Sequence, residues 1–126
     1  MINEFRGKYF FLSNFYLAPI IYEGITYQNN ESAFQSAKVV NKDIRLKFAD
    51  LDPSSAKRKG RNVQLRYDWE KVKFDIMYEI VKAKFTQNED LKNKEEINSK
   101  WLIEATEKFC KDRAVYNAIM QSIKII

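Results

Sequence analysis

Three side chains suited to a polar site are spaced along one short stretch, Tyr27–Lys38. Glu31, Gln35 and Lys38 offer a carboxylate, an amide and an ammonium group at positions i, i+4 and i+7. If a helix begins beside Glu31, this spacing places all three groups on one helix face. Such a row could bind a polar ligand, but the exposed charged face of a surface helix would give the same pattern.

Two local signals predict the elements that hold this stretch. Asn29 and Asn30 are favourable N-cap residues, so they predict a first helix over 31–40. Before that helix, Gly24 lies in a short turn between two apolar runs, which predicts a β hairpin over 20–27. The candidate site would therefore follow directly after a hairpin.

The strongest helical pattern lies further along the chain, where Asp68 is a natural N-cap for a helix that runs to about Phe85. Its apolar line consists of Val72, Ile76, Ile80 and Ala83, extended by Met77 and Val81. The other predicted elements are a helix over 43–49, a helix from Pro53 to Gly60, a short helix over 88–94, an extended segment over 101–103 and a last helix from Lys111 or Asp112. These elements predict one mainly helical domain over residues 1–126.

The residue types that the chain lacks exclude several kinds of catalysis. There is no histidine, which excludes Ser-His-Asp and Cys-His mechanisms and histidine zinc sites. The single cysteine, Cys110, can form neither an intramolecular disulfide nor a thiolate metal site. Acid–base chemistry would therefore fall to Asp, Glu, Lys, Tyr or water.

The net charge of +5 favours an anionic partner such as a phosphorylated metabolite or nucleic acid, although it could also serve solubility alone. The densest group of cations follows Pro53, and no acidic residue interrupts it in the sequence. Its members are Lys57, Arg58, Lys59, Arg61 and Arg66. Guanidinium groups bind phosphate oxygens in pairs, so this group could form a phosphate site, while a solvated helix face would also explain it.

The overall composition predicts a soluble cytoplasmic protein. Hydrophobic residues make up 45% and charged residues 31%, which is typical of a globular domain rather than a disordered chain. No apolar run has the length of a membrane span, and the N-terminal residues MINEFRGKY do not have the pattern of a signal peptide. We therefore expect no membrane partner.

Three motifs, taken together, resemble the NADAR family, also called YbiA-like N-glycosidases. They are FLSNFY (Phe11–Tyr16), YEGITYQNNESAFQSAK (Tyr22–Lys38) and the segment from DPSSAKRKGRN to VKAKFTQN (Asp52–Asn88). The resemblance implies a mainly α fold with a small N-terminal hairpin and hydrolysis of an N-glycosidic bond on a ribosyl compound. The implied substrates are phosphoribosylamino-pyrimidines or ADP-ribose attached to guanine or a related group, so a nucleic acid could carry the modified base. Neither a metal nor another cofactor is implied.

The resemblance also implies roles for individual residues. Two of the family's catalytic residues are a glutamate, which corresponds to Glu31, and a tryptophan, which corresponds to Trp69 and would also form a wall of the pocket. The implied substrate-binding residues are Ser13, Asn14, Phe15, Gln35, Lys38, Arg58 and Arg61.

The sequence departs from the family at a third catalytic position, an aspartate in a D-x-x-W-G segment. The chain has EKFCKDRAVYN in this region, where Asp112 is the nearest candidate but could instead cap the last helix. Two functions follow from this departure. The chain is either an N-glycosidase or a catalytically impaired relative that binds or sequesters an ADP-ribose-like nucleotide.

Overall fold

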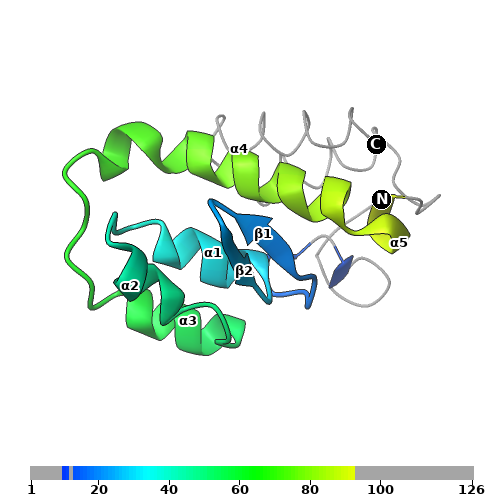
Figure 1. The fold of residues 1–126 in the computed structure, drawn as a ribbon, viewed down its shortest axis with the longest axis horizontal. Helices are drawn as coiled ribbons and strands as arrows, with labels where there is room; N and C mark the ends of the chain where they lie inside the picture. Colours follow the sequence, from blue (N-terminus) through cyan, green and yellow to red (C-terminus); the bar gives the residue numbers. More distant parts are fainter. Residues whose placement is uncertain (1–9, 12, 93–126) are drawn as a thin grey trace.

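The computed structural model describes residues 10–11 and 13–92, and in this part of the chain it is mainly helical with one two-stranded hairpin. Figure 1 shows three layers: the long helix α4 on one side, helices α2 and α3 on the other, and the hairpin with helix α1 between them. This arrangement confirms the predicted fold class. The predicted extended segment over 101–103 and the predicted last helix lie outside the described residues.

The hairpin consists of β1 (Ile20–Tyr22) and β2 (Ile25–Tyr27), which pair antiparallel with Tyr22 opposite Ile25. Glu23 and Gly24 form the two-residue turn, and both have positive φ values, 47° and 82°. Positive φ at both positions is the geometry that matches the twist of the flanking strands, and glycine adopts it without steric cost. The hairpin prediction is confirmed with its predicted bounds.

Helix α1 (Asn30–Ser36) begins where the sequence predicts but ends earlier. Asn29 is the N-cap, and its side-chain oxygen accepts a hydrogen bond from the Ser32 backbone N–H at 2.8 Å. The predicted extension to residue 40 is wrong because the next carbonyl groups bind partners elsewhere in the fold. The Lys38 carbonyl accepts from the Arg66 backbone N–H at 2.8 Å, and Lys38 therefore lies after the helix rather than in it.

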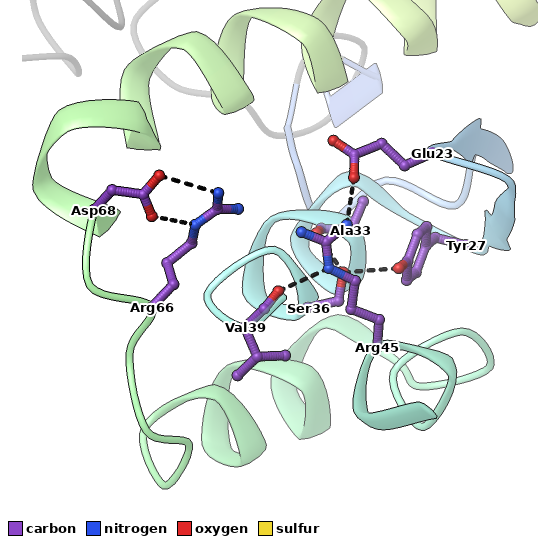
Figure 2. Close-up of polar contacts among 8 residues, drawn as sticks. All are labelled: Glu23, Tyr27, Ala33, Ser36, Val39, Arg45, Arg66 and Asp68. Atoms are coloured by element: carbon purple, nitrogen blue, oxygen red, sulfur yellow. Dashed lines mark hydrogen bonds and ion pairs between the residues drawn. The ribbon is translucent and has the colours of Figure 1, made fainter. Parts of the chain in front are cut away.

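Helix α2 (Lys42–Leu46) is shorter than the predicted 43–49, and residues 47–50 form turns. Its buried Arg45 connects helix α2 to the hairpin. The Arg45 guanidinium donates to the Val39 carbonyl at 2.7 Å and to the Glu23 carboxylate in the hairpin turn at 2.5 Å. Figure 2 shows this bridge. Helix α3 (Pro53–Gly60) has the predicted bounds, with Asp52 as its N-cap.

Helix α4 (Trp69–Gln87) contains the predicted apolar stripe. Ile76, Met77, Ile80, Val81 and Ala83 are buried, and Val72 packs against the same core. The stripe prediction is therefore confirmed.

The start of α4 differs from its prediction in one detail. The Asp68 side chain makes no capping hydrogen bond. It accepts instead from the Arg66 guanidinium at 2.6 and 3.1 Å, as Figure 2 shows.

The end of α4 binds the edge of the hairpin through side-chain amides. Gln87 acts as a substitute for a neighbouring strand, since its amide accepts from the Ile21 N–H at 2.7 Å and donates to the Ile21 carbonyl at 3.0 Å. The next residue, Asn88, donates to the Pro19 carbonyl at 3.1 Å. Helix α5 (Glu89–Lys92) follows directly and forms the described part of the predicted helix over 88–94. None of the described helices combines the length and apolar character that a membrane crossing needs.

Candidate functional site

The start of α1 brings Glu31 together with its predicted neighbour Gln35. The Gln35 amide nitrogen donates to the Glu31 carboxylate at 2.9 Å, which is the i, i+4 contact that the spacing predicts. Gln35 is buried, whereas Glu31 is half-buried and so combines a fixed side chain with access from solvent. A carboxylate held in this way can act on a ligand without first losing conformational freedom.

The loop Ser13–Phe15 lies directly against the start of α1. The Glu31 backbone N–H donates to the Asn14 carbonyl at 3.1 Å, and the Asn14 side-chain oxygen accepts from the Asn30 amide at 3.0 Å. The Ser13 hydroxyl accepts from the Phe15 N–H at 3.0 Å, so the serine side chain stabilises a turn within the loop. Of these three predicted substrate-binding residues, Asn14 is therefore the one whose hydrogen bonds reach the start of α1.

Lys38 lies close to Glu31 although it is outside the helix. Burial lowers the pKa of the Lys38 ammonium, the Glu31 carboxylate opposes this effect, and the Arg61 guanidinium adds to it. The Lys38 ammonium also donates to the Gly60 carbonyl at 3.4 Å. One carboxylate and two cations thus lie near each other at the junction of α1 and α3.

The predicted cationic group separates into parts in the folded chain. Arg66 forms its ion pair with Asp68, and Arg58 donates to the Ser55 hydroxyl at 3.1 Å near the start of α3. Lys59 lies over the Phe48 ring at 5.7 Å. The exposed Arg61 guanidinium has no hydrogen-bond or ion-pair partner among residues 10–11 and 13–92. The exposed Lys57 also has no such partner among these residues, so what distinguishes Arg61 is that its charge acts on Lys38, beside which it can bind an anion.

Trp69 is buried at the first position of α4, with 7% of its surface exposed, and belongs to the main core. Its ring packs against Phe34, with the centroids 5.2 Å apart. Phe34 is only partly buried and follows Glu31 by three residues, so it lies about one turn along the same helix. Phe34 was not among the predicted site residues, although its i+3 spacing from Glu31 is a signal that could have identified it.

A second residue that sequence analysis missed is Lys84, which is almost completely buried on α4. Its ammonium donates to the Ser13 carbonyl at 2.7 Å and lies 5.4 Å from the ring centroids of Tyr16 and Phe85. Burial lowers the pKa of Lys84 to about 7. Lys84 therefore anchors the loop that contacts the start of α1.

A third predicted catalytic residue is not among the groups that the structure places at the site. Asp112 lies outside the described residues. Within the described ranges, no three Asp, Glu, Cys or His side chains gather as a metal site would require. The groups that the structure brings together are thus a carboxylate, an amide, two cations and an aromatic pair.

The chain matches the NADAR domain family over residues 3–112. It is 36% identical to the N-glycosidase YbiA of Shigella flexneri over 83 residues, which cover 64% of this chain and 52% of that protein. It is 35% identical over 86 residues to a riboflavin biosynthesis protein of Vibrio vulnificus, which cover 64% of this chain and 23% of that protein. The chain thus spans about half the length of the N-glycosidase relatives that it matches.

The fold is similar to the NMR structure of the Escherichia coli protein YbiA. The TM-score is 0.71 at 25% sequence identity, and the match covers 98% of this chain and 82% of that chain.

Proposed function

The chain belongs to the NADAR domain family, and from this membership we propose that it hydrolyses the N-glycosidic bond of a ribosylated amine or base. The observation that carries the proposal is the Glu31 carboxylate, held by Gln35 and lying beside the cations of Lys38 and Arg61. A phosphoribosylamino-pyrimidine and an ADP-ribosylated base are the two substrate classes that this arrangement suits. Each combines a ribosyl C–N bond with phosphate groups.

Cleavage of a ribosyl C–N bond develops positive charge at the anomeric carbon, as in other glycoside hydrolyses. The bond electrons leave with the nitrogen, which takes up a proton, while water adds to the anomeric carbon and loses one. Glu31 is placed to stabilise the developing cation or to accept the proton of the attacking water. In a chain without histidine, a fixed carboxylate is the group best suited to this task.

Lys38 and Arg61 supply the opposite charge for the phosphate part of the substrate. Binding energy gained there can be used to orient the ribosyl group against Glu31. The ring of Phe34, supported by the buried Trp69, offers an apolar surface near the same carboxylate for a base or for the ribosyl cation. In this proposal Trp69 supports that apolar surface from within the core.

A second candidate function rests on the missing D-x-x-W-G segment. A relative without the third catalytic group could keep the carboxylate and cations and bind an ADP-ribose-like nucleotide without cleaving it. In that case, binding would persist while the rate of bond cleavage falls to that of the uncatalysed reaction.

The test of the proposed function is product release from both substrate classes. The protein is incubated with a phosphoribosylamino-pyrimidine and, separately, with an oligonucleotide that carries ADP-ribosylated guanine, and the free amine or base is measured by mass spectrometry. We expect catalytic release from at least one of them. Release no faster than in buffer from either substrate would reject hydrolysis of these classes.

Arg61→Ala should weaken the binding of a phosphorylated ligand more than the binding of its dephosphorylated counterpart. Loss of a charge-assisted hydrogen bond costs about 1.5–3 kcal/mol, so the affinity for the phosphorylated ligand should fall about tenfold or more. Calorimetric titration with ribose 5-phosphate and with ribose measures both effects.

Arg58→Ala is the matched comparison for this prediction, because it removes the same group from the last turn of α3, where the guanidinium already donates to the Ser55 hydroxyl. If Arg61→Ala weakens the binding of both ligands equally, Arg61 does not bind the phosphate group. A comparable phosphate-specific loss in Arg58→Ala would place both guanidinium groups there.

A further inference from the structure

Gly60, the last residue of α3, lies against the side chain that holds Glu31. A β-carbon built on Gly60 would lie 1.9 Å from the Gln35 side-chain oxygen and 2.8 Å from its Cδ. Non-bonded atoms do not approach so closely, so a side chain at this position would displace the Gln35 amide. Helices favour alanine over glycine, and the φ of Gly60 is not in the left-handed region. The close approach to Gln35 is therefore the structural reason for a glycine here.

The Gln35 amide is confined between two neighbours. Its nitrogen donates to Glu31 at 2.9 Å, while its oxygen is buried without a hydrogen-bond partner among the described residues and lies against Gly60. Only 6% of Gln35 is exposed, so solvent has little access to the amide. The bare backbone of Gly60 thus determines where the amide lies, and the amide in turn determines where the Glu31 carboxylate lies.

The same glycine also contacts the cationic side of the site. The Lys38 ammonium donates to the Gly60 carbonyl at 3.4 Å, on the side of the site where the Arg61 guanidinium acts on Lys38. Gly60 therefore contacts Gln35, which holds the Glu31 carboxylate, and its carbonyl accepts from the Lys38 ammonium. Both charged groups of the proposed mechanism are thus adjacent to this glycine or to its neighbour.

We propose that Gly60 is a positioning residue for the site: its lack of a side chain lets Gln35 direct the Glu31 carboxylate toward the substrate. The catalytic consequence rests on the proposed hydrolase function, whereas the packing relation does not. Gly60→Ala should therefore lower kcat by about tenfold or more, because small displacements of a catalytic group have large effects on rate. KM should change much less than kcat, since α3 otherwise keeps its structure.

A double substitution tests whether Gly60 acts through Gln35. Gln35→Ala removes the obstructed amide, so adding Gly60→Ala to it should cause no further loss of kcat. The β-carbon of residue 35 remains 3.1 Å from a β-carbon at position 60, so kcat rather than stability is the quantity compared. Ser54→Ala, at an exposed position of the same helix, is the control and should leave kcat unchanged. Additive losses in the double variant would overturn the proposal. If Gly60→Ala alone does not fold, the double variant should fold as Gln35→Ala does, and failure of that rescue would also overturn it.

A second readout does not depend on activity. The side-chain amide signals of Gln35 in a proton–nitrogen NMR spectrum should shift in Glu31→Gln, because their hydrogen-bond acceptor changes, and should also shift in Gly60→Ala. Unchanged Gln35 signals in Gly60→Ala would overturn the proposal even if turnover falls. If the wild-type protein cleaves nothing, only the hydrolase proposal fails. The Gln35 signals in Gly60→Ala then still test whether Gly60 positions the Gln35 amide.

Discussion

Glu31→Gln is expected to lower the turnover of a ribosylated amine by about a hundredfold or more, as for loss of a general base. The substitution keeps the size of the side chain and a hydrogen-bonding group, but it removes the negative charge. That charge acts mainly on the cation that develops in the transition state, so the affinity for the intact substrate should change much less. Steady-state kinetics and calorimetric titration measure the two effects separately.

Glu79→Gln provides the matched control for this prediction, because Glu79 is an exposed carboxylate on α4 outside the site. It should leave turnover at the wild-type value. If Glu31→Gln cleaves the substrate as fast as the wild-type protein, Glu31 is not the catalytic carboxylate.

Lys84→Met should remove a pH dependence of stability that the buried lysine creates. Burial lowers the pKa of Lys84 to about 7 in the folded chain, whereas an unfolded lysine keeps its ordinary value of 10.5. Between these two values the unfolded chain binds a proton that the folded chain does not, so the free energy of unfolding rises with pH. The burial penalty is complete below pH 7 and declines as the pH rises. The wild-type protein should therefore gain about 2 kcal/mol relative to Lys84→Met between pH 7 and pH 9.

Urea unfolding of both proteins at each pH measures this difference. Lys71→Met is the control, since Lys71 is exposed on the same helix, and its stability difference from the wild-type protein should stay nearly constant with pH. A constant difference for Lys84→Met would show that Lys84 keeps its proton in the folded chain over this range.

Local sequence patterns predicted the elements whose signals are themselves local. Gly24 marks the hairpin turn, Pro53 begins α3, and the apolar stripe of α4 is repeated over several turns. These features depend on backbone sterics and on burial of one helix face, which short stretches of sequence specify. The Glu31–Gln35 contact was predictable for the same reason, because both residues lie on one helix.

The features that sequence analysis missed depend on partners distant in the chain. Helix α1 ends before Lys38 because Arg66, 28 positions later, binds the Lys38 carbonyl. Lysine is rarely buried, so no local pattern indicates that Lys84 reaches the Ser13 carbonyl. The close packing of Gly60 on Gln35 joins two helices, and neither helix alone indicates it.

The central claim, that this chain is a hydrolase rather than a nucleotide-binding protein, is tested most directly by a single-turnover experiment. The wild-type protein, in molar excess and above the dissociation constant, is mixed with ADP-ribosylated guanine or with a phosphoribosylamino-pyrimidine, and both products are measured over time. We predict that at least one substrate is converted completely to free base or amine and the ribosyl product. Tight binding with the intact substrate recovered after the same time would contradict the claim and favour the binding function.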